Sequence, residues 1–343
     1  MTDDKNSIFE DNLSNMQRKR LTGQLGLLSL LILLVVIFSL LSPNFRTVNN
    51  LRSILSSYSH IAIMAVGVAF PILLGEIDLS VGAIMGLVGM VMFNLLLIHQ
   101  VPAPLAIVIG LLIGIACGLV NALLINRFKL QPFITTLATL VAYRGITYGI
   151  SGRQLFPETT VQAITDPFYL SIDTRIGIVP YAFIYLIILV GLTHVLLQHT
   201  RLGINIYATG GNETAAQLSG INVSRIRIFA YAFSGLCSAI AAMILTSRMR
   251  STQESLGLSF ELSAITAVII GGVSLRGGIG TTIGPAIGAF LAGTLYTGLT
   301  MIGVTTYAQP VIVGVVLIIA VAYDKLLARR QRERQLERGA QHV

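Results

Sequence analysis

The chain has few charged residues, and this shortage excludes an ordinary soluble protein. Charged residues make up 11% of the 343 positions and hydrophobic residues 54%, whereas soluble domains carry about 25% charged residues. The composition therefore predicts a polytopic membrane protein. The two cysteines, Cys117 and Cys237, lie inside apolar runs without CxxC spacing, so neither a disulfide framework nor a cysteine metal site is indicated.

Sequence signatures of nucleotide binding and of catalysis are missing as well. The chain contains no GxxxxGK[ST] motif, and its glycine-rich segment GGVSLRGGIG at 271–280 is not followed by the required lysine. It also contains no HExxH and no GxSxG motif. We therefore expect no catalytic residue, no metal site and no cofactor bound by this chain.

The net charge of +8 raises the question of a nucleic-acid partner. The basic residues occur in short clusters beside apolar runs, as in QRKR at 17–20, rather than along one continuous stripe. This distribution is typical of the charges that orient membrane proteins. We therefore expect no nucleic-acid partner.

Ten apolar runs approach the length of about 20 residues that a membrane-spanning helix needs. They cover residues 21–41, 54–74, 79–98, 103–125, 131–150, 178–198, 226–246, 258–273, 282–302 and 307–324. The sequence thus predicts an all-α polytopic membrane protein with about ten transmembrane helices. The transmembrane domain covers 21–324, between an N-terminal tail at 1–20 and a C-terminal tail at 325–343.

The distribution of basic residues predicts the orientation of these spans. Of the 23 lysines and arginines, sixteen fall on one side, six fall on the other, and Arg144 lies within a span. Because cytoplasmic segments carry the excess of positive charge, we expect both termini in the cytoplasm. The same count places the 201–227 loop in the cytoplasm and the 151–177 loop, with short interfacial pieces, outside.

A faint internal repeat relates the two halves of the chain. KLQPFI at 129–134 matches YAQPVI at 307–312, and VAYR at 141–144 matches VAYD at 321–324, with offsets of 178 and 180. These segments belong to the fifth and tenth expected spans, so the two copies enter the membrane from opposite sides, as a pseudo-symmetric inverted repeat. A second similarity, between GEIDLSVG at 75–82 and GGVSLRGG at 271–278, has an offset of 196 and does not fit the same duplication.

The segment GEIDLSVG places Glu76 and Asp78 between two apolar runs. Acidic groups at membrane depth are costly and usually face a cavity or a cation. One interpretation is a broken helix whose carboxylates line a translocation path or hold its gate. The other is a tight turn at the cytoplasmic surface, in which Asp78 and Ser80 cap the next helix. Arg144 is a further candidate for the path, because an intramembrane arginine needs a partner or water.

Glycines near the C-terminal end indicate close backbone packing. We expect 271–280 to form a membrane-embedded turn that lets backbones approach one another. The next span carries Gly284, Gly288 and Gly293, and small residues at such positions permit close contact between helices.

The longest polar segment between spans is 201–227, and its centre has the signals of a short helix. Asn212 is the expected N-cap, Glu213 lies in the first turn, and Gly220 ends the helix. Ala215 and Ala216 are small enough for another surface to approach closely. The segment is either a cytoplasmic connector or a coupling helix for a separate ATPase, with 201–209 and 221–227 as flanks.

Four motifs in a characteristic order carry a resemblance to a known family. They are GEIDLSVG at 75–82, ATLVAYRGITYGISG at 138–152, YATGGNETAAQLSGINVSRIR at 207–227 and AVIIGGVSLRGGIGTTIGPAIGA at 267–289. With them the chain resembles the ribose-type permeases of bacterial ABC importers, the second carbohydrate-uptake class, from about 42 to 324. This class is related more distantly to branched-chain amino-acid permeases.

Two departures from the family pattern limit what the resemblance transfers. The 213–220 segment is similar to the EAA-xxx-G loop that docks the ATPase, but Thr214 stands where the family has alanine. The family also has Gly-Gly before Ile-Asp in the first motif, whereas this chain has Gly75 and Glu76. A role for Glu76 is therefore not inherited from the family.

The resemblance implies the transmembrane permease subunit of an ATP-driven importer in the bacterial inner membrane. Two protomers, as a homodimer or a heterodimer, would sit in membrane lipid and each bind a domain of a cytoplasmic ABC ATPase, which uses the ATP. They would receive a monosaccharide or a sugar-like molecule from a periplasmic sugar-binding protein. The ATPase-coupling residues implied are Gly211, Asn212, Glu213, Ala215, Ala216 and Gly220.

An ion-coupled secondary transporter is the alternative. It is motivated by the inverted repeat and by the two carboxylates Glu76 and Asp78 at membrane depth. Neither interpretation identifies the substrate, because the sequence shows no clear aromatic platform along the path.

Overall fold

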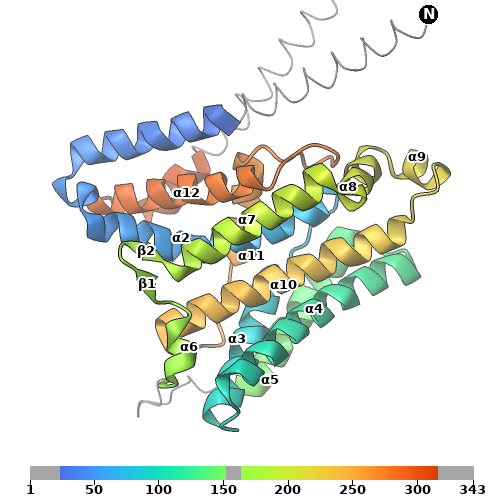
Figure 1. Ribbon diagram of the computed structural model, residues 1–343, viewed down its shortest axis with the longest axis horizontal. Coiled ribbons are helices and arrows are strands. Elements are labelled where there is room, and N and C mark those ends of the chain that lie inside the picture. The colour runs from blue at the N-terminus through green and yellow to red at the C-terminus, as the bar shows by residue number, and fades with distance from the viewer. Residues whose placement is uncertain (1–23, 152–163, 316–343) are drawn as a thin grey trace, which may run out of the picture.

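The computed structural model describes residues 24–151 and 164–315, which form mostly α-helices (Figure 1). The first described helix is Gln24–Leu41, and the last begins at residue 308. The long helices between them are α2 (Val48–Leu73), α3 (Val81–Leu97), α4 (Ala103–Phe128), α5 (Pro132–Ser151), α7 (Tyr181–His199), α10 (Val223–Met249), α11 (Phe260–Ile270) and α12 (Ile283–Met301).

Short elements connect the long helices at both ends of the molecule. They are η1 (Pro43–Arg46), α6 (Pro167–Ser171), β1 (Arg175–Ile176), β2 (Val179–Pro180), α8 (Arg201–Gly211) and α9 (Glu213–Leu218). The two strands pair antiparallel. The described part of the 151–177 loop, residues 164–177, contains α6 and β1.

Six described helices are long and apolar enough to cross a membrane. They are Gln24–Leu41, α2, α4, α7, α10 and α12, and α3 and α11 are shorter apolar helices. Many large hydrophobic side chains on the long helices are exposed, as on α4 and α7, where lipid tails would cover them. The protein is thus a polytopic, all-helical membrane protein. Most of the tenth expected span, 307–324, lies outside the described residues.

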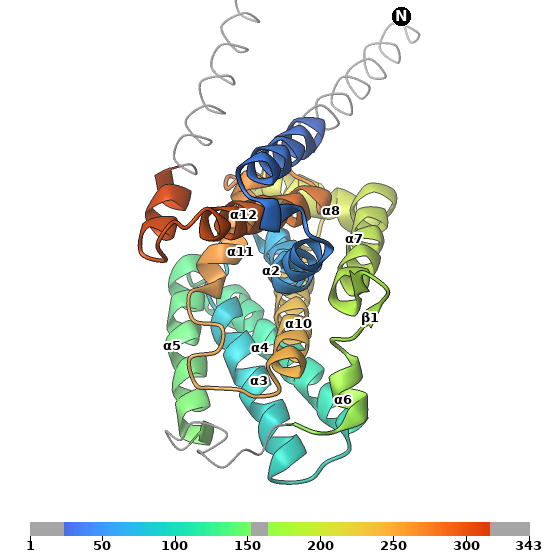
Figure 2. The same ribbon diagram turned by 90° about the vertical axis from the view of Figure 1, so that its left-hand side faces the viewer.

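Helix α2 occupies the centre of the bundle. Nearly all of its residues from Ser59 to Leu73 are buried, because α10, α12, α11 and α7 pack around it. Figure 2 shows α3, α4 and α5 gathered on one side of α2 and α10, with α12 and the first described helix on the other. The bundle therefore surrounds the second half of α2, whereas the first turns of this helix are partly exposed.

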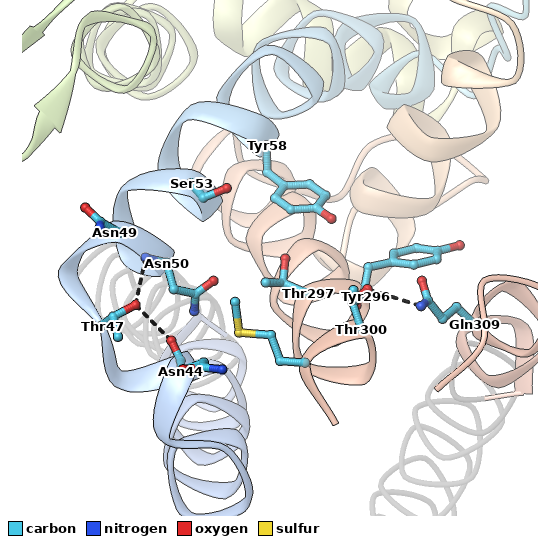
Figure 3. A pocket seen from close by; sticks show the side chains of 11 residues that line it. Asn44, Thr47, Asn49, Asn50, Ser53, Tyr58, Tyr296, Thr297, Thr300 and Gln309 are labelled. Carbon is cyan, nitrogen blue, oxygen red and sulfur yellow. Dashed lines mark hydrogen bonds between the residues drawn. The ribbon is translucent and has the colours of Figure 1, made fainter. Parts of the chain in front are cut away.

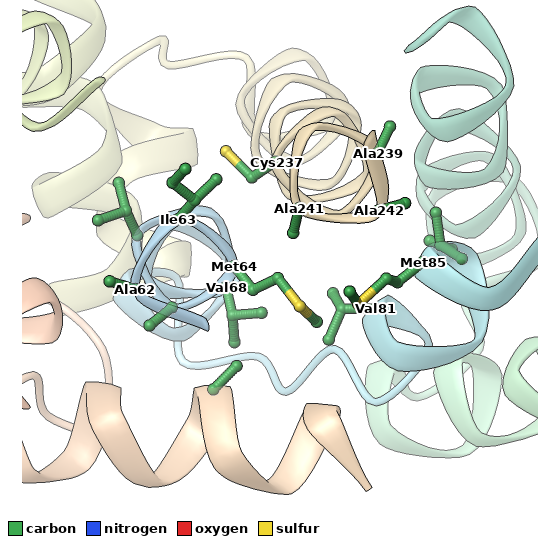
Figure 4. Close-up of a cluster of buried hydrophobic side chains, with 14 of the residues drawn as sticks. Ala62, Ile63, Met64, Val68, Val81, Met85, Cys237, Ala239, Ala241 and Ala242 are labelled. Carbon is green, nitrogen blue, oxygen red and sulfur yellow. The ribbon is translucent and has the colours of Figure 1, made fainter. Parts of the chain in front are cut away.

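Small side chains let α10 approach α2 and α3 closely. In Figure 4, Ala241 and Ala242 of α10 face Met64 of α2 and Met85 of α3, and all four are buried. On the opposite side of α10, a Cβ added at Gly118 of α4 would overlap the carbonyl oxygen of Tyr231. Because residues such as Gly118 have little or no side chain, the backbones of α4 and α10 come into direct contact.

The glycines near the C-terminal end pack as predicted. A Cβ added at Gly284 would overlap backbone atoms of Gly271. A Cβ added at Gly288 would overlap the carbonyl oxygen of Ala267, and one added at Gly293 would overlap the ring of Tyr58. The prediction of close helix contact along α12 is therefore confirmed.

Candidate functional site

The segment α8–α9 forms a helical hairpin-like arm that leads from α7 into α10. Asn212 caps α9 by accepting a hydrogen bond from the Ala215 backbone N–H at 2.9 Å. Gly220 ends the arm with a φ of +81°, a conformation that glycine adopts without strain. The predicted short helix, with its N-cap and its glycine stop, is confirmed.

The surface of α9 is exposed except on one side. Ala216 is buried against the rest of the chain, whereas Ala215 is exposed. Leu218 is 86% exposed, and an added Cβ at Gly211 would meet no atom within 4 Å. Only one of the two alanines expected to face a partner therefore lies on the open face.

Arg227 connects α9 to two other parts of the protein. Its Nε donates to Glu76 Oε1 at 2.6 Å, its Nη1 donates to Asn126 Oδ1 of α4 at 2.8 Å, and its Nη2 lies 3.4 Å from Glu213 Oε1. Arg227 and Glu76 are 10% and 7% exposed at their side chains, whereas Glu213 is 50% exposed. One guanidinium thus joins the exposed arm to the buried Glu76 and to the half-buried Asn126.

Asp78 lies deeper and is held by hydroxyl groups. Its Oδ1 accepts hydrogen bonds from the Ser80 N–H at 3.0 Å and the Ser80 hydroxyl at 2.6 Å. Its Oδ2 accepts from the Ser234 hydroxyl of α10 at 2.9 Å, and Asn121 of α4 donates to the Ser80 hydroxyl at 2.8 Å. These bonds join the start of α3 to α10 and α4.

The connection between α2 and α3 is a turn that is exposed at Gly75 and buried at Glu76 and Asp78. Gly75 has a φ of +81°, and Asp78 is fully buried. Ser80 is the N-cap residue of α3 but makes no side-chain cap hydrogen bond. The interpretation as a tight turn therefore holds at Gly75, but two parts of it are corrected: Asp78 lies beneath α10 and α4, and Ser80 makes no side-chain cap bond.

Three segments with glycines meet beside the arm. The Gly278 N–H donates to the Leu73 carbonyl at 2.9 Å, and the Tyr207 hydroxyl of α8 donates to the Gly280 carbonyl at 2.8 Å. A Cβ at Gly210 would overlap the Leu73 carbonyl oxygen. The segments 75–82 and 271–278, whose similarity did not fit the repeat, are thus neighbours in space.

Arg144 is remote from this cluster. Its Nη1 donates to the carbonyl oxygens of Glu254 and Leu256, at 3.2 and 2.7 Å. Arg144 therefore holds the connection between α10 and α11 against α5. The structure brings Glu76 and Glu213 to one cluster, puts Asp78 beneath it, and leaves Arg144 at another site.

Two residues of the cluster were not anticipated from the sequence. Arg227 lies in a segment predicted to be only a flank, and Asn126 lies near the end of an ordinary apolar span. The sequence offered one signal that could have found Arg227, namely that a buried acidic residue requires a basic partner. A buried Glu76 needs a cation, and Arg227 lies near the start of the predicted span that follows Glu213.

Comparisons with known proteins identify the family. A family model described as the permease component of the branched-chain amino acid transport system matches residues 50–321. The chain is 37% identical to the ribose import permease protein RbsC of Haemophilus influenzae over 325 residues, which is 94% of this chain and 100% of that protein.

Similar relatives occur in Escherichia coli. The chain is 40% identical to the ribose import permease protein RbsC over 306 residues, with 89% of this chain and 94% of that protein covered. It is 36% identical to the galactose/methyl galactoside import permease protein MglC over 332 residues, with 90% and 96% covered. The chain belongs to this family of membrane transport permeases.

Proposed function

We propose that this chain is the membrane-spanning subunit of an ATP-driven importer for a neutral monosaccharide. The relatives named above import ribose or galactose, a pentose and a hexose. The chain has no nucleotide-binding motif of its own, so a separate ABC ATPase supplies the energy. A periplasmic binding protein delivers the sugar, and two permease protomers, identical or related, enclose the path.

The observation that carries this proposal is that α9, the exposed part of the arm, is joined to the buried side chain of Arg227. An exposed leucine, Leu218, gives the arm an apolar surface for a partner to cover. Glu213, the first residue of α9, also connects the arm to the protein interior, because it pairs with Arg227. An arm with both features is suited to receive a movement and transmit it.

The transmission runs through Arg227. When the ATPase closes on nucleotide and moves α9, the Glu213 carboxylate moves with it. The same guanidinium holds Glu76 before α3 and Asn126 on α4. Displacement of α9 therefore changes the position of α10 relative to α3 and α4, and such a change biases the protein between two states.

An inverted repeat supports the transporter assignment. The starts of corresponding helices in the two halves are separated by nearly constant distances along the chain. The separation is 175 residues from α2 to α10 and 179 from α3 to α11. It is 180 from α4 to α12 and 176 from α5 to the helix that begins at residue 308. These spacings agree with the sequence offsets of 178 and 180 between the two halves. The first long helix of each repeat packs against the other repeat: α10 contacts α3 and α4, and α2 contacts α11 and α12. We assign the two halves to an inverted repeat within a ten-span protein.

In the orientation we propose, both termini and α8–α9 are in the cytoplasm. The connections 74–80 and 271–282 then lie on the cytoplasmic side with the arm. The beginning of α2, the end of α12 and the 164–180 segment lie on the periplasmic side. This assignment follows from the excess of lysine and arginine on the arm's side.

Co-purification of the ATPase tests the coupling role of the arm. We expect Glu213→Lys and Gly220→Pro each to abolish association with the ATPase while the permease remains inserted. The first places two cations together, and the second puts proline where φ is +81°. Arg175→Glu, a charge reversal on the exposed strand β1 at the opposite end, should leave co-purification unchanged.

Two results would contradict the proposal. Undiminished recovery of the ATPase with both arm variants would exclude α9 as its docking site. Sugar uptake into proteoliposomes driven by an ion gradient, with no ATPase present, would instead establish the ion-coupled alternative. In the structure, Glu76 pairs with Arg227 and Asp78 accepts from two serine hydroxyls, and these contacts favour the ATP-driven mechanism over a cation site at the two carboxylates.

A further inference from the structure

A polar hollow of about 700 Å³ lies between the beginning of α2 and the end of α12. Its walls carry hydroxyl and carboxamide groups, chiefly those of Asn50, Ser53, Tyr58, Tyr296, Thr297 and Thr300. We propose that this neutral hollow binds a non-phosphorylated monosaccharide on the periplasmic side, on its way into the permease. The inference rests on the proposed function and extends it to a sugar-contacting site.

The chemistry of the lining matches a neutral, polyhydroxylated ligand. Eleven residues line the neutral hollow; ten are polar and uncharged, and the other is Met301. Such side chains both donate and accept hydrogen bonds, as sugar hydroxyls do. The volume also lies in the range of about 300–1,000 Å³ that is typical of small-molecule sites. An ionised ligand would find no counter-charge among these residues.

The neutral lining contrasts with that of a neighbouring hollow, which contains charged residues. This second hollow, of about 610 Å³, shares Asn49 and Ser53 with the neutral hollow but is also lined by three arginines and one carboxylate, namely Arg52, Arg175, Arg248 and Asp173. Anions are therefore favoured in one hollow and have no partner in the other. The two adjacent surfaces separate charged groups from neutral ones at the same end of the bundle.

The α2 wall of the neutral hollow combines a fixed carboxamide with an exposed hydroxyl. The Asn50 side-chain nitrogen donates to the Phe45 carbonyl at 2.9 Å, which fixes the carboxamide. Its Oδ1 is buried and has no hydrogen-bond partner among the described residues. In Figure 3 the side chains of Asn50, Ser53 and Tyr58 lie across from those on α12. The exposed Ser53 hydroxyl on the same wall can both donate to and accept from a ligand hydroxyl.

The α12 wall is held in place by packing and by the next helix. The ring of Tyr58 lies against Gly293, where a Cβ would overlap it. The Gln309 side-chain nitrogen donates to the Thr300 hydroxyl at 3.1 Å and to the Val304 carbonyl at 3.0 Å. The polar groups are thus oriented before any ligand arrives, which lowers the entropic cost of binding.

Uptake by the reconstituted complex provides the first test. The permease, its ATPase and its binding protein are placed in proteoliposomes and supplied with labelled D-ribose, D-allose or D-galactose. Tyr296→Phe combined with Thr297→Val removes two hydroxyl groups and little volume, so we expect about a three- to tenfold lower initial rate for the transported sugar. Thr306→Val, an exposed threonine outside the lining, should transport at the unmodified rate.

Cysteine labelling provides a second test that does not depend on transport. Both natural cysteines are buried, so Thr300→Cys introduces the accessible thiol for a membrane-impermeant maleimide. We expect labelling from the outside and at least threefold slower labelling as the transported sugar is added. Arg175→Cys, in the second hollow only, should label at a rate that the sugar leaves unchanged.

The outcomes separate this inference from the proposed function. If the unmodified complex transports none of the three sugars, the sugar-importer function falls, and the site falls with it. If it transports sugar, but the double variant transports at the same rate and sugar does not slow labelling of Thr300→Cys, the neutral hollow is not a sugar site. Labelling of Thr300→Cys from the cytoplasmic side alone would also overturn the site.

Discussion

Replacement of Arg227 by methionine would leave the Glu76 carboxylate buried without its cation. The two side chains are 10% and 7% exposed and are joined at 2.6 Å. Removing one partner of a buried ion pair costs about 3–5 kcal/mol, because the other charge stays uncompensated. The contact with Glu213 adds about 0–1 kcal/mol, since that side chain is half exposed. We therefore expect Arg227→Met to destabilise the permease by about 3–5 kcal/mol.

Thermal unfolding in detergent measures this loss. Cys117 and Cys237 are both buried, so a thiol-reactive dye gains signal as the helices separate. At about 2 °C per kcal/mol for a long chain, the midpoint should fall by about 6–10 °C. Arg225→Met is the matched control, because Arg225 is exposed on the same helix. Its stability should change by less than about 0.5 kcal/mol.

A double variant separates stability from coupling. Glu76→Met together with Arg227→Met replaces the pair by two apolar side chains of similar length, a change that is often neutral. The midpoint should return to near that of the unmodified protein, while sugar uptake stays low because α9 has lost its anchor. An unchanged midpoint for Arg227→Met alone would refute the energetic reasoning, and normal uptake by the double variant would refute the relay.

Three further predictions concern packing, the buried carboxylate and pH. Gly118→Ala should lower the free energy of unfolding by about 1–3 kcal/mol, because its Cβ overlaps the Tyr231 carbonyl; Gly191→Ala, in open space, should not. Asp78→Asn should unfold within about 1 kcal/mol of the unmodified protein because it keeps an oxygen acceptor, whereas Asp78→Leu should lose about 1–3 kcal/mol. Burial raises the pKa of the Asp173 carboxyl despite a nearby arginine. The folded state therefore prefers the protonated acid and loses stability as pH rises through that raised pKa, so the midpoint of Asp173→Asn should gain on the unmodified protein between acidic and neutral pH.

The membrane class, the positions of the helices and the short helix α9 were readable from the sequence. Each depends on residues close together in the chain. A span needs an apolar run of about 20 residues, and a cap needs an acceptor within three residues of the N–H it binds, as at Asn212. The resemblance of four ordered motifs supplied the family, which the comparisons confirm.

Only the tertiary structure decided which polar groups meet. Glu76 and Arg227 are 151 residues apart, and Asp78 and Ser234 are 156 apart. No periodicity relates such positions, because their contact is set by the packing of α2, α4 and α10. The same packing buries Asp78 within a turn that one interpretation of the sequence placed at the surface, and it brings the beginning of α2 and the end of α12 together at the neutral hollow. Local sequence fixes where helices begin and end, whereas the environment of a polar side chain depends on which other helices surround it.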